Sequence, residues 1–331
     1  MAAEHPESAW LWAPGEPERL ALLPVRHPEV WAFRKKIEAL HWTAQEVDMG
    51  RDAADWARLT PPERALVTHV LSFFARVDID VLGNLEEGLG PLVDCLEAQF
   101  VYAAQKDQEC VHSEVYALSI ETLLPEGERE RALRAVVASP SVRRMREWAL
   151  AAFAGAGPGR RLAAAAFVEG VMFSASFAVL QWLRTRDLLP GLTVANEYIA
   201  RDEGVHTAFS CHLFTRWLAP AARPGRAEVR AMLEGLLPLL DDFVAEGMPE
   251  ALPGLAPADL RAYTRHTARA VYADLGFDDL PMGANPLPMM EAMCLNGVGK
   301  ANFFERRVTS YQRPVGAGAA ALGVDDSPLD D

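Results

Sequence analysis

Apolar residues recur at helical spacing along most of this chain. Seven long stretches carry hydrophobic residues three or four positions apart, and breaks containing Pro and Gly separate them. No segment convincingly shows the strict alternation of apolar and polar residues that indicates a half-buried strand. We therefore predict helices over residues 61–85, 92–124, 128–154, 160–186, 192–218, 226–246 and 257–275.

The breaks between these helices are short, which favours a single helix bundle. Short loops such as Leu189-Pro190-Gly191 make consecutive helices antiparallel neighbours. A length of 331 residues alone suggests two domains, but the continuous helical pattern overrides that expectation. We predict an all-α fold with one domain over residues 24–313, a flexible N-terminal segment over 1–23 and a flexible acidic tail over 314–331.

One predicted helix is apolar enough to cross a membrane. Residues 162–183 are nearly all apolar or small, and Glu169 is the only charged residue among them. A carboxylate near the middle of a membrane span costs roughly 2.5 to 3.5 kcal/mol on insertion scales, and the chain has no second segment of this kind. We interpret the segment as a fully buried core helix and expect no membrane association.

Charge and cysteine content narrow the functional class. The formal net charge of -14 disfavours binding to a nucleic-acid backbone or to an anionic membrane. The four cysteines are scattered without a Cys-x-x-Cys pair, which is typical of a reducing compartment. The N-terminus lacks a basic stretch followed by an apolar segment, so we expect a cytoplasmic protein.

Two Glu-x-x-His motifs give the first indication of chemistry. Glu109 and His112 form one motif, Glu203 and His206 form the other, and each motif lies inside a predicted helix. Residues three positions apart share a helix face, so each motif can direct one carboxylate and one imidazole toward the same point. One motif alone is weak support for a metal site, but two on separate long helices are more informative.

Two further acidic residues lie on apolar helix faces. Asp78 follows the apolar run that begins at Leu71, and Glu169 lies between Val168 and Gly170. Taken singly, each is more often a salt-bridged helix residue, but a buried carboxylate without a partner is costly, and a shared metal pair satisfies all of them. Four carboxylates and two neutral imidazoles carry a charge of about -4, which two divalent cations cancel, and this set without thiolates favours iron or manganese. One acid from each of two helices and Glu-x-x-His from each of two others is the ligand pattern of ferritin-like bundles.

A tyrosine lies on the same helix face as the first motif. Tyr116 follows His112 by four residues, about one helical turn beyond that ligand. Phe173 and Phe177 follow Glu169 at matching spacing, and Ile199 precedes Glu203 by four residues. These side chains predict a dry pocket around the Tyr116 phenol, although a tyrosine packed in a core is the more common role of such a residue.

The sequence resembles the small, radical-generating subunit of class I ribonucleotide reductase from about residue 24 to 313. In combination, the motifs that carry the resemblance are highly specific. They are His69-Val-Leu-Ser-Phe-Phe-Ala-Arg-Val-Asp78, Cys110-Val-His-Ser-Glu-Val-Tyr116, Phe167-Val-Glu-Gly-Val-Met-Phe173, Ala200-Arg-Asp-Glu-Gly-Val-His206 and Ser310-Tyr-Gln-Arg313.

The resemblance assigns roles to individual residues. Tyr116 matches the tyrosine that such proteins oxidise to a stable radical. Trp42 matches a tryptophan of the radical route, which an aspartate, here Asp202, links to the first metal-bound histidine. Tyr311 matches the tail tyrosine that passes the oxidising equivalent to the large subunit. The six implied metal ligands are Asp78, Glu109, His112, Glu169, Glu203 and His206.

The resemblance also implies a divided activity. This chain would form a homodimer that generates and stores a one-electron oxidant, while a large subunit would reduce ribonucleotides to deoxyribonucleotides. The C-terminal segment would dock on the large subunit, although residues 325–331 lack the terminal aromatic residue common in the family. Two irons per chain are favoured, while a manganese–iron pair or two manganese ions accept the same ligands and stay open.

Two other functions share the same bundle and ligands. A dinuclear-metal oxidase would act on another substrate without a partner, and it would have no use for a relay through Trp42, Tyr116 and Tyr311. A ferritin-like metal store would take up many ions per chain rather than two. Turnover without a large subunit would identify the oxidase, and metal counting would identify the store.

Overall fold

The computed structural model describes residues 20–154 and 156–293. Within those ranges the regular elements are all helical, and the single β-type contact is an isolated antiparallel bridge between Leu252 and Leu255. The predicted all-α class is therefore confirmed for the described part of the chain. The predicted N-terminal segment up to residue 19 and the predicted tail lie outside it.

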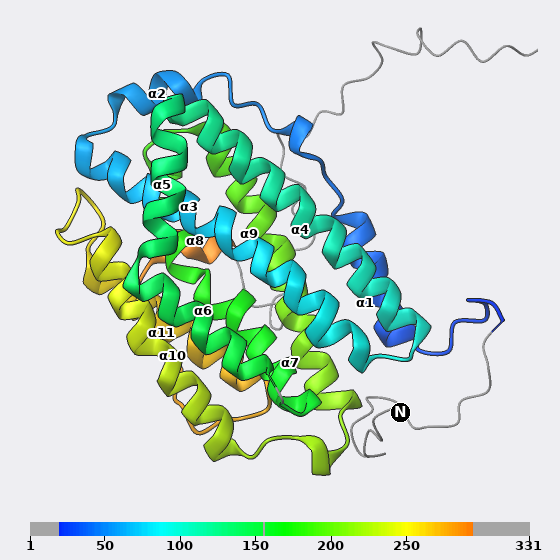
Figure 1. The fold of residues 1–331 in the computed structure, drawn as a ribbon. Coiled ribbons are helices and arrows are strands. Elements are labelled where there is room, and N and C mark those ends of the chain that lie inside the picture. Colours follow the sequence, from blue (N-terminus) through cyan, green and yellow to red (C-terminus); the bar gives the residue numbers. More distant parts are fainter. Residues whose placement is uncertain (1–19, 155, 294–331) are drawn as a thin grey trace, which may run out of the picture. The chain divides into compact units, whose positions relative to one another are not determined.

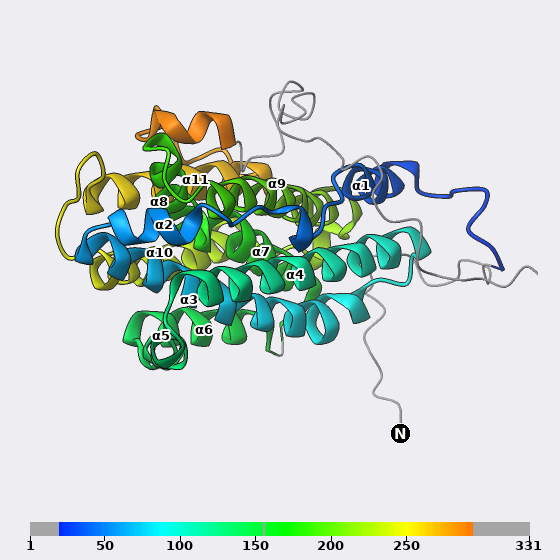
Figure 2. The same cartoon turned by 90° about the horizontal axis from the view of Figure 1, so that it is seen from above.

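The bundle that carries the predicted ligands consists of α3, α4, α9 and the consecutive pair α7 and α8. α3 packs along α4, while α9 packs against α7 and α8 and also contacts α4 (Figures 1 and 2). The bounds of these helices are α3 Pro61–Gly83, α4 Leu96–Leu123, α7 Pro158–Phe167, α8 Ser174–Thr185 and α9 Pro190–His212.

Further helices cover this bundle. α1 lies against α4 and α9, whereas α10 packs between α6 and α11 (Figure 1). These covering helices are α1 Pro28–Ala39, α2 Asp52–Arg58, α5 Glu126–Ala138, α6 Pro140–Phe153, α10 Arg226–Gly247 and α11 Pro257–Asp274. The sequence pattern did not predict α1 or α2, because both are short and lie before the first long apolar stretch.

The predicted helix over 128–154 is wrong as a single element. The chain forms α5 and α6 instead, with a break at Ser139, whose backbone is extended at ψ 128°. Pro140 is the first residue of α6, and a proline disfavours helical backbone at the residue before it. The Ser139 hydroxyl then caps α6 by accepting a hydrogen bond from the Val142 N–H.

The predicted helix over 160–186 is also interrupted. A π-helical turn, η5 (Val168–Met172), separates α7 from α8 and contains Glu169. The most apolar window of this 28-residue span is entirely buried, which confirms the interpretation as a core helix. Two further π-helical turns occur in the described residues, η3 (Asn84–Leu89) after α3 and η6 (Leu213–Trp217) after α9. Such turns often occur at functional sites, and apolar spacing alone does not reveal them.

Buried polar contacts fix where α9 begins. The Asp52 carboxylate on α2 accepts hydrogen bonds from the N–H groups of Gly191 (2.9 Å) and Leu192 (2.8 Å). These N–H groups have no partner within their own helix, so Asp52 satisfies them and favours the N-terminus of α9. A Cβ atom at Gly191 would lie 2.5 Å from the Asp48 carbonyl oxygen, so this close approach requires glycine.

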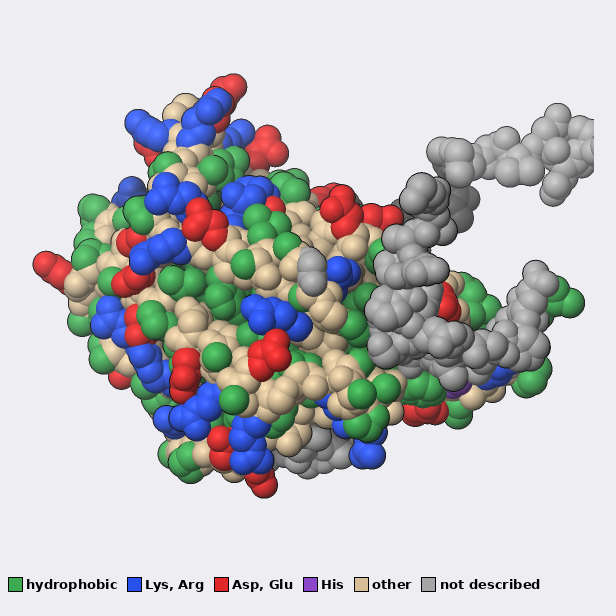
Figure 3. Space-filling model, turned by 60° about the horizontal axis from the view of Figure 1, so that its bottom comes forward, with side chains coloured by type: hydrophobic (Ala, Val, Ile, Leu, Met, Phe, Trp, Pro, Cys, Tyr) green, Lys and Arg blue, Asp and Glu red, His purple; other side chains and the backbone are tan. Residues whose placement is uncertain are grey.

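Surface ion pairs contribute little compared with this packed core. Basic and acidic side chains are interspersed over the face drawn in Figure 3. Pairs such as Arg144–Asp242 (2.7 Å) link neighbouring helices but are about half exposed. Exposed pairs of this kind contribute about 0 to 1 kcal/mol each, so the apolar core accounts for most of the stability.

Candidate metal centre

The six predicted ligands meet in one buried cluster. Each side chain is at most 2% exposed, and the set comes from α3, α4, η5 and α9, as the sequence pattern predicts. The members are Asp78, Glu109, His112, Glu169, Glu203 and His206.

Two glutamates lie between the two imidazoles. His112 Nδ1 is 3.5 Å from Glu109 Oε2 and 3.2 Å from Glu203 Oε1. His206 Nδ1 is 3.2 Å from Glu109 Oε1 and 3.6 Å from Glu203 Oε2. Each glutamate therefore presents one oxygen to each imidazole, which is the arrangement that carboxylates bridging two ions require.

The remaining two acids complete separate halves of the cluster. Asp78 interacts electrostatically with His112, and Glu169 interacts with His206. Ligand atoms of Glu109, Glu169, Glu203 and His206 all lie within 4.8 Å of one another. The cluster thus has an Asp78 half and a Glu169 half, joined by Glu109 and Glu203.

The cluster fits a metal pair because its buried atoms lack other partners. Within the described residues, at least one carboxylate oxygen of each acid and Nδ1 of both histidines are buried without a hydrogen bond. An unsatisfied buried polar atom costs about 1 to 3 kcal/mol, so shared cations would remove a large penalty. Oxygen and imidazole ligands without a thiolate match iron and manganese.

Without metal, protons balance the charge of the cluster. Burial and neighbouring carboxylates raise the pKa of Asp78 and of Glu169 well above the ordinary value. Burial lowers the pKa of His206, but Glu109 and Glu203 outweigh it and raise that pKa to about 10. At His112, burial again lowers the pKa, but the facing carboxylates outweigh burial and raise that pKa well above its ordinary value. The metal-free centre therefore holds protons that bound cations must displace.

Metal loading should release protons, in a number that depends on pH, because the pKa values of Asp78, Glu169, His112 and His206 are all raised in the metal-free centre. All four groups have a raised pKa, so metal affinity should rise as pH rises and fall as pH falls. Calorimetric titration of the metal-free chain in buffers of different ionisation enthalpy measures this number. Release of no protons would show that the four groups do not take up the metal.

The predicted link behind His112 is present in the structure. Trp42 Nε1 donates a hydrogen bond to Asp202 Oδ2 at 2.7 Å, and the same oxygen lies 3.3 Å from His112 Nε2. Both Trp42 and Asp202 are buried. Arg201 donates to the Leu40 carbonyl oxygen at 2.8 Å and lies 3.5 Å from Asp202 Oδ1. The imidazole is therefore oriented by a carboxylate, an arrangement that tunes metal-bound histidines.

Sequence reasoning missed two amides on α4 that orient the other half of the cluster. Gln108 Oε1 lies 2.9 Å from His206 Nε2, and Gln105 Nε2 donates to Glu169 Oε1 at 2.8 Å. Both glutamines are buried. Gln105 precedes Glu109 by four residues, so an amide on the ligand-bearing helix face was a signal available in the sequence.

Tyr116 is buried beside a cluster of phenylalanine rings. Its side chain is 1% exposed, and the Phe74 ring stacks on it at 4.6 Å with an interplanar angle of 4°. The Phe173 and Phe177 rings contact Phe74, with ring centroids 5.6 and 5.1 Å from it, and their own predicted contact with the phenol stays a prediction. Ile199 is buried on α9, and its contact with the phenol stays a prediction. Burial, and then the negative charge of the cluster, raise the pKa of Tyr116 well above its usual value, so the phenol keeps its proton.

Phe74 is the pocket residue that the sequence analysis did not single out. It precedes Asp78 by four residues on α3 and therefore shares the ligand-bearing face. Tyr311 and the acidic tail lie outside the described residues. Their predicted roles stay predictions.

The chain matches known proteins along most of its length. The family model for ribonucleotide reductase, small chain, matches residues 19–286. The ribonucleoside-diphosphate reductase small chain of Vaccinia virus (strain Ankara) is 38% identical over 299 residues, covering 90% of this chain and 92% of the viral protein. Ribonucleoside-diphosphate reductase subunit M2 of Homo sapiens is 37% identical over 317 residues, covering 95% of this chain and 78% of the human protein.

Solved structures share the fold at lower sequence identity. The Saccharomyces cerevisiae ribonucleotide reductase Rnr4 homodimer aligns with a TM-score of 0.74 at 23% identity, covering 83% of this chain and 88% of that one. Streptococcus sanguinis dimanganese(II)-NrdF aligns with a TM-score of 0.73 at 17% identity, covering 83% of this chain and 99% of that one.

Proposed function

Because this chain belongs to the ribonucleotide reductase small-chain family, we propose that its buried cluster holds two metal ions and generates the oxidant for ribonucleotide reduction. The observation that carries the proposal is the position of Glu109 and Glu203, which each lie between His112 and His206. Carboxylates placed in this way would hold two cations, and two cations would account for the burial of so many charged groups together.

The six residues of the cluster would hold the two ions in its two halves. When bound, the metal pair supplies the redox chemistry that creates a one-electron oxidant. Iron in both positions is our first choice. A manganese–iron pair or two manganese ions also suit these ligands, and the related S. sanguinis protein is a dimanganese(II) NrdF.

Tyr116 is the residue that would store the oxidising equivalent. Its phenol is buried, protonated and without a hydrogen-bond partner among the described residues, and Phe74 excludes water from one ring face. An oxidised phenol in this setting is separated from solvent reductants. Among the charged groups around Tyr116, Asp78 contributes most to its raised pKa.

The hydrogen-bonded series from His112 through Asp202 to Trp42 would carry the oxidant away from the centre. Tyr311 would continue the route, and the acidic C-terminal tail would dock on a large subunit that binds the ribonucleotide. We also propose that the chain functions as a homodimer in the cytoplasm. The solved Rnr4 relative is a homodimer, which supports that assembly.

Deoxyribonucleotide formation with and without the large subunit tests this function. The metal-loaded chain should be active only with the large subunit, and Trp42→Phe should reduce turnover at least about 100-fold because the indole N–H that donates to Asp202 is lost. Metal content should stay at two per chain. Trp148→Phe, on α6, serves as the matched control and should keep turnover. Oxidation of another substrate by the chain alone, or full turnover in Trp42→Phe, would contradict the proposal.

A further inference from the structure

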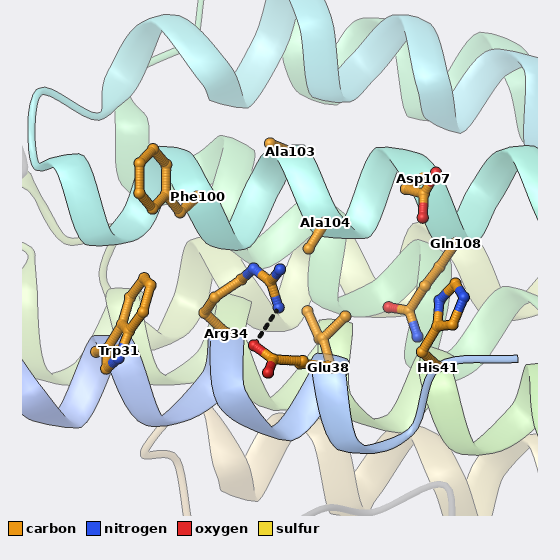
Figure 4. Close-up of a pocket in the computed structure, with 10 residues that line it drawn as sticks. Trp31, Arg34, Glu38, His41, Phe100, Ala103, Ala104, Asp107 and Gln108 are labelled. Atoms are coloured by element: carbon orange, nitrogen blue, oxygen red, sulfur yellow. Dashed lines mark hydrogen bonds and ion pairs between the residues drawn. The ribbon is translucent and has the colours of Figure 1, made fainter. Parts of the chain in front are cut away.

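A cavity of about 670 Å³ lies between α1 and α4. One of the residues that line it, Gln108, contacts the predicted metal ligand His206. Trp31 and Phe100 flank one end, while His41 and Gln108 lie at the other (Figure 4). His41 and Phe100 are exposed, so the cavity is open to solvent. Gln108 is only 4% exposed and forms part of its inner wall.

Gln108 separates this cavity from the Glu169 half of the cluster. His206 directs Nδ1 at Glu109 and Glu203, so its Nε2 carries a proton whether a metal or a second proton occupies Nδ1. That proton is donated to Gln108 Oε1 at 2.9 Å. The orientation of the Gln108 amide is thereby fixed, with its Nε2 directed away from His206.

The other end of the Gln108 amide lacks an acceptor. Its Nε2 is buried and has no hydrogen-bond partner in the described part of the chain. A buried amide N–H without an acceptor is costly, so a small molecule that accepts a hydrogen bond would be favoured beside it once it has passed the Gln108 side chain. The unsatisfied Gln108 N–H therefore favours small molecules that accept a hydrogen bond.

Other residues around the cluster are engaged in buried contacts with the ligands or with one another. Trp42 and Asp202 cover His112, and Gln105 covers Glu169. The ring of Phe74 covers Tyr116. In the described part of the chain, the Gln108 side chain both lines an open cavity and contacts a predicted metal ligand, His206.

Resting on the proposed function, we infer that the α1–α4 cavity is the entry port for small hydrogen-bond-accepting oxidants, with Gln108 as its gate. The Gln108 N–H binds the entering molecule, and rotation of the side chain opens the way to the His206 position. Gln108 acts through position and does not itself react. Glu38 and Asp107 give the cavity an acidic lining, while Arg34 pairs with Glu38 at 3.3 Å.

The rate at which azide reaches the centre tests this inference. Azide is a small hydrogen-bond acceptor that produces an absorption band on binding ferric ions, so stopped-flow mixing with the iron-loaded, oxidised full-length chain reports access without turnover. Gln108→Leu should slow azide binding about tenfold, because it fills the gate and cannot hydrogen-bond. Gln108→Ala should accelerate it, because the gate is removed.

The opposite directions of the two Gln108 variants distinguish a gate from a residue that only orients His206. Both variants lose the hydrogen bond to His206, so a purely orienting role would change the rate in the same direction in both. Ala104→Phe, which fills the cavity without altering Gln108, should also slow azide binding. Gln99→Leu, on the same helix, should have no effect because Gln99 contacts the Val93 carbonyl oxygen instead.

Metal content measured on each sample distinguishes a failure of the proposed function from a failure of the gate. A wild-type chain that holds no metal pair would overturn the proposed function itself. Equal azide rates in all variants, or changes in one direction for both Gln108 variants, with two metals retained, would overturn the gate alone. Slower binding in Gln108→Leu and Ala104→Phe together with faster binding in Gln108→Ala supports it.

Discussion

Replacing Glu109 with alanine should abolish the dinuclear centre. Glu109 presents one oxygen to each imidazole, so its loss removes a ligand from both halves at once. Burial raises the pKa of Glu109, yet the two facing imidazoles outweigh burial and lower that pKa to about 2. The imidazoles therefore strongly stabilise the negative charge of Glu109. We expect metal content to fall from two ions to fewer than one per chain, and turnover with the large subunit to be lost.

Metal analysis after dialysis measures this effect. Groups that only orient a ligand typically change metal affinity about 10- to 100-fold, and a bridging ligand should exceed that range. Glu114→Ala is the matched control, because Glu114 is exposed on the same helix and accepts a hydrogen bond from Gln45. Retention of two ions in Glu109→Ala would exclude Glu109 as a shared ligand.

Tyr116→Phe should separate metal binding from radical storage. The substitution removes one buried hydroxyl that has no hydrogen-bond partner among the described residues, and it preserves the stack on Phe74. The fold and both metal ions should therefore be retained. Electron paramagnetic resonance after oxidation should show no tyrosyl signal, and turnover should fall to the level that any metal-centred oxidant sustains.

A second buried tyrosine on α4 provides the control for this experiment. Tyr102 is 3% exposed, and like Tyr116 it has no hydrogen-bond partner for its hydroxyl in the described residues. Tyr102→Phe should leave the tyrosyl signal unchanged, because Tyr102 does not stack on Phe74. An intact signal in Tyr116→Phe would assign the radical to another residue.

The ligand set could be predicted from the sequence because it depends on local spacing. Glu109 and His112 share a face because their three-residue spacing is close to one helical turn of about 3.6 residues, and the same holds for Glu203 and His206. The acids on apolar faces were conspicuous because a buried carboxylate needs a partner. The structure brings all six together from four separate segments.

Features that depend on packing between helices could not be predicted in this way. The π-helical turn that contains Glu169 interrupts the helix without altering the apolar pattern. Stacking of Phe74 on Tyr116 joins α3 to α4, and the contact between Gln108 and His206 joins α4 to α9. Spacing along one helix carries no information about such contacts, although each of these residues lies beside or one turn from a ligand.

Metal counting combined with electron paramagnetic resonance on the full-length chain tests the central claim most directly. The chain should bind two metal ions, and these should be magnetically coupled because Glu109 and Glu203 are shared between them. Exposure of the reduced centre to an oxidant should then produce a radical or a high-valent signal. Uptake of many ions per chain, or of ions that show no coupling, would contradict a dinuclear centre.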